Sequence, residues 1–125
     1  MAHPIVYVDT SEIREGKLED LQIAMRDSSA FVEAHMPRLI SYGFFLDEVR
    51  KTMTVVAVHP DSASLEFHLE EGADEFRKFA DLIELRTIEV YGAVGAGAVE
   101  RLDAKARTLG SGTVDVHELY AGFAR

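Results

Sequence analysis

The residues best placed for chemistry are one histidine and several aromatic side chains. His68 lies between Leu65 and Gly72 along the apolar side of a predicted helix, so its imidazole is expected to face the interior. A neutral imidazole can take a proton from an activated phenol or enol, because its ordinary pKa of about 6.5 suits proton transfer near neutrality. The alternative is a core histidine hydrogen-bonded to a tyrosine or a backbone carbonyl.

Aromatic side chains on the predicted strands suit a flat ligand beside this histidine. Tyrosine hydroxyls would fix such a ligand through a few hydrogen bonds, while the rings contact its faces. The candidates for substrate binding are Tyr42, Tyr91, Tyr7, Phe44 and His35. Aromatic residues on strands also serve as large core residues, and His35 is equally placed to cap the last carbonyl groups of its helix. Both alternatives stay open.

No other combination of residues predicts a site. The remaining histidines, among them His59 and His117, are scattered singly and lack the spacing of metal ligands. The glycine-rich run at 92–97 lacks both the Lys-Ser/Thr of a phosphate-binding loop and the acidic residue of a dinucleotide fingerprint. We therefore predict neither a metal nor a cofactor.

The composition of the chain indicates which partners and which cellular location to expect for the protein. The chain has 125 residues, enough for one domain, and its formal net charge of -9 disfavours nucleic acid. It has no cysteine, hence no disulfide, and no apolar run near the roughly 20 residues of a membrane span. These features predict a cytoplasmic protein that binds neither membranes nor nucleic acid.

The elements that position these residues follow from apolar spacing and from turn residues. Pro37 ends the first helix, because the residue before a proline is pushed out of the helical region. Asp61 or Ser62 can cap the second helix. The predicted strands are 4–10, 39–47, 53–59, 85–94 and 113–123, and the predicted helices are 17–36, 62–83 and 98–109. The alternative for the second helix is a bend or an interruption at Glu71-Gly72.

Two of the predicted strands are apolar on both faces. In 39–47, Phe45 points one way and Phe44 the other, and in 53–59 Val55 and Val56 alternate in the same manner. Two main helices can cover only one face of an antiparallel sheet, so the other face needs a second sheet. The simplest supplier is a second copy of the chain, which predicts a homodimer.

The middle of the sequence resembles the antibiotic biosynthesis monooxygenase-like proteins, and is most similar to small bacterial members of unknown role. The residues that carry the resemblance are the strand 54–58, the turn His59-Pro60-Asp61-Ser62, and Leu65, His68, Leu69, Phe76 and Phe79. In element order it covers about residues 4–94. It implies an α+β, ferredoxin-like βαββαβ domain with an antiparallel sheet, paired into a dimeric α+β barrel. Residues 98–125 would then be a helix–strand extension at the dimer interface of a single 1–125 domain.

The resemblance also implies an activity. Some members oxidise polycyclic phenols with O₂ and no metal or flavin, so we expect a cofactor-independent monooxygenase acting on a small aromatic or polyketide-like substrate. The pocket would lie between the sheet and the helices, with His68 as base and Tyr42 or Tyr91 positioning the substrate oxygen. The deprotonated, electron-rich substrate would then react with O₂ directly.

The same residues argue against one other activity of the family and leave two non-catalytic functions open. Haem-degrading members rely on an asparagine, a tryptophan and a histidine ligand, whereas this chain has no asparagine or tryptophan, and Ala80 stands at the ligand position. Haem degradation is therefore not expected. The runner-up function is a non-catalytic dimer that binds a small molecule or serves as an accessory protein, and a third is a structural partner subunit.

Overall fold

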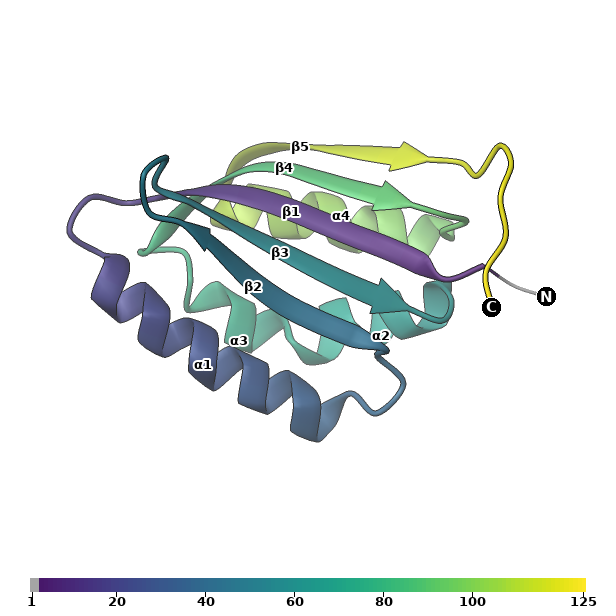
Figure 1. The fold of residues 1–125 in the computed structure, drawn as a ribbon, viewed down its shortest axis with the longest axis horizontal. Helices are drawn as coiled ribbons and strands as arrows, with labels where there is room; N and C mark the ends of the chain where they lie inside the picture. Colours follow the sequence, from purple (N-terminus) through teal and green to yellow (C-terminus); the bar gives the residue numbers. More distant parts are fainter. Residues whose placement is uncertain (1–2) are drawn as a thin grey trace.

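The computed structural model describes residues 3–125, which form one mixed α+β unit (Figure 1). In this part of the chain the elements are β1 (Ile5–Ile13), α1 (Leu18–His35), β2 (Ser41–Asp47), β3 (Thr52–His59), α2 (Ser62–Glu71), α3 (Ala73–Arg77), β4 (Ile83–Tyr91), α4 (Ala96–Leu109) and β5 (Gly110–His117). Among these residues no helix is both long enough and apolar enough to cross a membrane.

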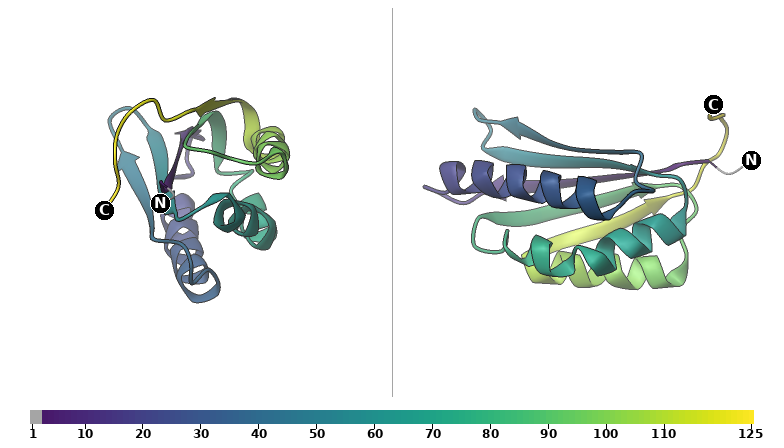
Figure 2. Two further views of the ribbon diagram at one scale, coloured as in Figure 1. Left: turned by 90° about the vertical axis from the view of Figure 1, so that its right-hand side faces the viewer. Right: turned by 90° about the horizontal axis from the view of Figure 1, so that it is seen from below.

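The strands form one five-stranded sheet in the order β2-β3-β1-β4-β5. The first four pair antiparallel, in the ferredoxin-like arrangement that the sequence predicts. β5 pairs with β4 in parallel, because α4 carries the chain back to the same end of the sheet. The helices lie on one face of the sheet, which curves over them (Figure 2).

The second predicted helix is shorter than expected, and it is interrupted at Gly72, as the alternative for this helix predicts. The chain forms α2 and then, after Gly72, the single turn of α3, and β4 already begins at Ile83. A Cβ at Gly72 would lie 2.4 Å from the ring of Phe76 and 2.8 Å from the carbonyl oxygen of His68. The glycine therefore lets the Phe76 ring pack against the helix backbone, where a larger residue would collide with it.

The last strand begins earlier than predicted. β5 starts directly after α4 and ends at His117, whereas the apolar pattern placed it at 113–123. Gly110 and Gly112 pass so close to the backbone of β4 that an added Cβ at Gly110 would lie 2.7 Å from Leu85 atoms. Parallel pairing next to β4 thus starts at these glycines, which the apolar pattern does not single out.

The core lies between the sheet and the helices. Alternate residues of each central strand point into it, such as Tyr7 on β1 and Val55 on β3. α4 buries Ala98, Leu102 and Ala106 on the same side, so it packs on the sheet of its own chain.

Among residues 3–125 no helix covers the opposite face of the sheet, which is largely apolar over β1, β2 and β3. Val6 and Val8 on β1 and Val56 and Val58 on β3 are half-buried there, and Phe45 on β2 is 59% exposed. The expectation that helices cover only one face is therefore confirmed.

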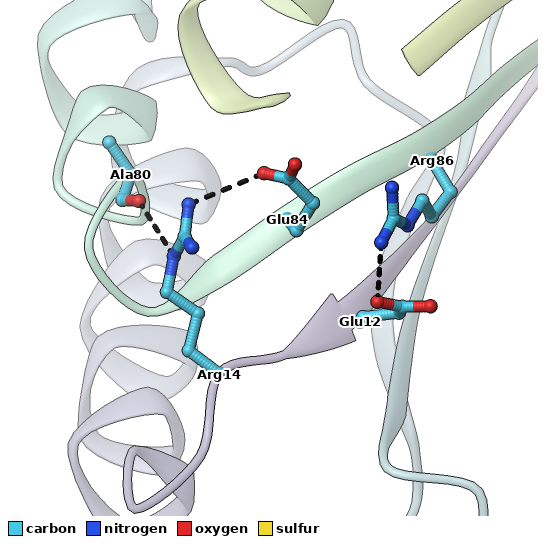
Figure 3. Close-up of polar contacts among 5 residues, drawn as sticks. All are labelled: Glu12, Arg14, Ala80, Glu84 and Arg86. Atoms are coloured by element: carbon cyan, nitrogen blue, oxygen red, sulfur yellow. Dashed lines mark hydrogen bonds and ion pairs between the residues drawn. The ribbon is translucent and has the colours of Figure 1, made fainter. Parts of the chain in front are cut away.

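Exposed ion pairs tie the end of β1 to β4 and to the turn before it (Figure 3). Arg14 donates to the carbonyl oxygen of Ala80 at 3.4 Å and to Glu84 at 3.3 Å, and Arg86 donates to Glu12 at 2.7 Å. Such exposed pairs stabilise a fold only slightly. Through Arg14 they link the end of β1 to the connection between α3 and β4.

Candidate functional site

A buried polar cluster joins β1 to α4. Tyr7 and Asp9 are two residues apart on β1, so both side chains point toward the helices. The Tyr7 hydroxyl donates to Asp9 Oδ2, and Lys105 Nζ of α4 donates to the Tyr7 hydroxyl oxygen at 2.8 Å and lies 3.5 Å from Asp9 Oδ2. The side chains of Asp9 and Lys105 are only 4% and 11% exposed. The three residues form a continuous chain of hydrogen bonds beneath the helices.

Burial shifts the pKa values of two residues of this cluster, Tyr7 and Lys105. It raises the pKa of Tyr7 well above the ordinary value, and the Asp9 carboxylate acts in the same direction, so the phenol stays neutral. Burial lowers the pKa of Lys105, while Asp9 opposes that change. The ammonium group also lies 4.8 Å from the ring centre of Tyr7 and 4.4 Å from that of Phe76, where the ring faces stabilise a cation.

One oxygen of this cluster is free. Asp9 Oδ1 is buried and has no hydrogen-bond partner among the described residues, although Oδ2 is bound by Tyr7 and Lys105. A buried carboxylate oxygen normally has a partner. Asp9 therefore presents an unused proton acceptor inside the protein, held in place through its other oxygen.

A small cavity adjoins Asp9 and Lys105 between the sheet and the helices. Its volume is about 20 Å³, which is room for one water molecule. Its aromatic lining consists of Tyr42, Phe44, Phe76 and Phe79. The rings of Phe44 and Phe79 stack with their centres 5.8 Å apart and fill much of the space.

A larger groove reaches the same lysine from outside. It has a volume of about 220 Å³ and lies between α2–α3 on one side and α4 on the other. Phe76, Lys105 and Leu109 line both the groove and the inner cavity. A molecule in the groove would therefore contact Lys105 directly, with Asp9 behind it.

Two buried histidines lie beside this site. His68 Nδ1 is 2.7 Å from the sulfur of Met36, and His59 Nδ1 is 2.9 Å from the Ser64 hydroxyl. The two imidazole centres are 5.2 Å apart, and the ring of Tyr42 packs against His68 at 5.4 Å. Nε2 of each histidine is buried without a partner among the described residues.

Burial makes both imidazoles weak bases. It lowers the pKa of His59 to about 4, and it lowers the pKa of His68 well below its ordinary value, with the positive charge of Lys105 adding to the effect. Both rings are therefore neutral at pH 7.

The structure brings together some of the residues that the sequence singled out. Tyr7 belongs to the polar cluster, and Tyr42 and Phe44 line the inner cavity. His68 is on the buried side of α2 as expected, and it adjoins the cavity through contacts with Tyr42 and with Phe76 at 4.9 Å.

Two other candidates lie outside the cavity. Tyr91 is on the open face of the sheet, 42% exposed, with its ring stacked on His117 at 4.6 Å. His35 is on the exposed side of α1, where its Nδ1 is 2.8 Å from the carbonyl oxygen of Phe31. That contact matches the alternative in which His35 binds the last carbonyl groups of its helix.

Sequence reasoning missed Asp9 and Lys105. Asp9 follows Ile5 and Tyr7 at every second position, so the alternation alone places a carboxylate on the buried face of a strand. A charged residue at a core position is the signal that singles it out. Lys105 gives a weaker signal, because it lies three residues after Leu102, at the edge of the apolar side of α4.

Comparison with known proteins identifies the fold. No family model matches the sequence, and no curated protein matches it either. Among solved structures, MupZ from Pseudomonas fluorescens is similar with a TM-score of 0.72 and 20% identity, over 98% of this chain and 95% of that chain. That similarity spans nearly the whole chain, so it includes the C-terminal helix and strand.

Two further similar structures carry a family name. A putative antibiotic biosynthesis monooxygenase from Chloroflexus aurantiacus has a TM-score of 0.58 and 15% identity, over 75% of this chain and 94% of that chain. Another putative antibiotic biosynthesis monooxygenase, from Bacteroides thetaiotaomicron, has a TM-score of 0.57 and 15% identity, over 66% of this chain and 85% of that chain. The chain therefore has the ferredoxin-like α+β fold of the antibiotic biosynthesis monooxygenase-like proteins, as the resemblance predicted.

The buried ion pair predicts a specific stability pattern. Lys105→Met should lower the free energy of unfolding by about 3–5 kcal/mol at pH 7, because Asp9 would keep a buried charge without its cation. Adding Asp9→Asn should recover more than half of that loss. Urea denaturation followed by circular dichroism measures both, with Lys78→Met, at an exposed ion pair, as the control. Equal losses in the two lysine variants would contradict the pairing.

The neutral histidines predict that acid destabilises the protein. An unfolded chain binds protons at His59 below about pH 6.5, whereas the folded chain binds one there only near pH 4. The contribution of this residue is thus complete above pH 6.5 and is lost as the pH falls toward 4, on the order of 2–3 kcal/mol. Urea denaturation between pH 7 and 4.5 should show a smaller loss in His59→Gln than in the parent protein. A loss of equal size in both would show that His59 is not the group responsible.

Proposed function

We propose that this protein is a cofactor-independent monooxygenase that deprotonates a small phenolic or enolisable substrate, aromatic or polyketide-like, and lets it react with O₂. The observation that supports this most is the free Oδ1 of Asp9, a residue that lines the inner cavity together with Lys105, which also lines the groove. Burial also raises the pKa of Tyr7 and lowers that of Lys105, and titratable groups with shifted pKa values next to a cavity are typical of active sites.

In this proposal Asp9 and Lys105 divide the proton transfer between them. Lys105 Nζ donates a hydrogen bond to the oxygen of the substrate hydroxyl, and Asp9 Oδ1 accepts the proton of that hydroxyl. The ammonium group then stabilises the phenolate, whose negative charge develops in a site with little water. Tyr7, held neutral by burial, keeps Asp9 oriented through the hydrogen bond to Oδ2.

The oxygen step needs no group beyond the substrate and O₂. The deprotonated substrate gives electrons to O₂ at a ring carbon, a C–O bond forms, and the peroxide takes up a proton. Loss of the C–H proton from that carbon and cleavage of the O–O bond release water and leave a quinone. One phenol and one O₂ thus give one quinone and one water.

His68 is the second candidate for the base. Its Nε2 is also without a partner, and its ring contacts Tyr42 and Phe76 of the cavity wall. His68 itself lines neither the inner cavity nor the outer groove, however, whereas Asp9 lines the inner cavity, so we propose Asp9 ahead of it. We propose Tyr42 and Phe44, which line the inner cavity, as the residues that contact the substrate from the sheet side once Phe76 turns aside.

The non-catalytic alternative is favoured by one observation. Phe44, Phe76 and Phe79 line the inner cavity and leave about 20 Å³, so a ring-sized ligand fits only in the outer groove unless Phe76 turns aside. A dimeric binding protein would need no more than that groove.

Oxygen uptake tests the reaction and its base. With a panel of polycyclic phenols including 2-naphthol, the parent protein should consume O₂ under metal-free conditions. Asp9→Asn should lower kcat at least about 100-fold, because it removes the proton acceptor. His68→Phe should lower kcat less than tenfold, and Asp103→Asn, exposed on α4, is the matched control.

Each other outcome of this test has a defined meaning. The reverse order of effects would make His68 the base. Binding of the phenols without any O₂ uptake would contradict the monooxygenase and support the binding protein. Circular dichroism of each variant separates a loss of activity from a loss of fold.

We also propose that a second copy of the chain covers the open face of the sheet. That face carries the exposed Phe45 and the half-buried valines of β1 and β3, an apolar area that an isolated domain would leave in water. Beyond β5, the exposed side chains of Leu119, Tyr120 and Phe123 are the part of the C-terminal extension that we propose contacts the partner.

Substitution on the two faces tests this dimer. Phe45→Asp should convert a dimer into a monomer in analytical ultracentrifugation, because it puts a charge within the apolar part of the proposed interface. Ile23→Asp, at an exposed apolar residue of α1, should leave the dimer intact. A parent protein that sediments as a monomer at micromolar concentration would contradict the proposal.

A further inference from the structure

The outer groove combines an apolar floor with a cationic rim. Its floor is formed mainly by Leu69, Ala73, Phe76, Ala104 and Leu109. Its charged lining consists of Arg77, Arg101 and Lys105 against a single acidic residue, Glu70. In a chain with a net charge of -9, this excess of cations around one groove is unusual.

Two of these three cations lie along one side of α4. Arg101 and Lys105 are four residues apart, so their side chains lie one turn apart on the same side of the helix. Lys105 is buried at the inner end, beside Asp9, whereas Arg101 is 44% exposed at the outer end. Arg77 of α3 lies across the groove. A ligand that spans the groove thus meets a cation at each end.

The rim arginines are available to a ligand. Arg101 pairs with Glu70 at 3.3 Å and Arg77 pairs with Asp74 at 2.7 Å, and both pairs are exposed to solvent. Exposed pairs contribute little to stability, so a ligand's carboxylate can replace them at small cost. Guanidinium groups also bind carboxylates with two parallel hydrogen bonds, which gives the contact a defined direction.

We infer that the ligand of this groove is a small organic acid: an apolar, phenol-bearing molecule whose carboxylate binds Arg101 and Arg77 while its hydroxyl oxygen meets Lys105. The groove volume of about 220 Å³ limits the apolar part to one or two fused rings. This inference rests on the proposed function and narrows its substrate class from phenols in general to phenolic acids.

A matched pair of compounds tests the inference. The protein is titrated with 2-naphthol and with 6-hydroxy-2-naphthoate, which differ by one carboxylate, and binding is followed by ligand fluorescence at pH 7.5. The acid should bind at least tenfold more tightly, and this preference should shrink as the salt concentration rises. A chain this acidic repels anions overall, so a preference for the acid can come only from a local cationic site.

Variants locate the cations responsible. Arg101→Gln should reduce the preference for the acid at least fivefold, and adding Arg77→Gln should bring the two dissociation constants close together. Arg50→Gln, at an exposed arginine of the β2–β3 turn, should keep the parent preference. An equal effect of Arg50→Gln and Arg101→Gln would overturn the assignment to the groove.

The outcomes separate this inference from the proposed reaction. If 2-naphthol binds as tightly as the acid and is oxidised, the inference fails and the monooxygenase stands. If the acid binds tightly through Arg101 but neither compound consumes O₂, the inference stands and the reaction fails. If neither compound binds, both are overturned.

Discussion

The buried contact between Asp9 and Lys105, with Tyr7 between them, is the constraint on which the rest of the structure depends. A carboxylate and an ammonium group cost several kcal/mol each to remove from water, and only their pairing offsets that cost. The contact therefore links α4 to β1 through the side chain of Lys105, which must be directed inward. It also leaves one carboxylate oxygen free on Asp9, which lines the inner cavity behind Lys105.

The helices form the walls of the cavity and the groove next to this contact. Gly72 breaks the second helix and lets the ring of Phe76 lie close to the backbone, where it forms a wall shared by the inner cavity and the outer groove. β5 then adds to the β4 edge, because Gly110 and Gly112 allow close parallel pairing. The helical face of the sheet thus holds the site, and the apolar opposite face is left for the proposed second copy.

Local sequence signals were enough for most of the fold. Pro37 marks the end of α1, and the Asp61 side chain caps α2 by accepting a hydrogen bond from the Ser64 backbone at 2.9 Å, as its residue type predicts. Alternation placed Val55 and Val56 on opposite faces of the sheet, as the structure has them. The pairing of Asp9 with Lys105 was not predictable in this way, because the partners are 96 residues apart and neither has a local signal for the other. The direction of β5 likewise depends on how α4 packs, which no short pattern encodes.

A crystal structure with bound 6-hydroxy-2-naphthoate would test the central claim most directly. We predict the phenolic oxygen within hydrogen-bond distance of Lys105 Nζ and near Asp9 Oδ1, with the carboxylate at Arg101 on the rim of the groove. The structure also has a second groove, which is lined by Met36, Phe67 and His68. A ligand found in that groove instead would contradict the assignment of chemistry to Asp9 and Lys105. That position would make His68 the residue on which the function depends.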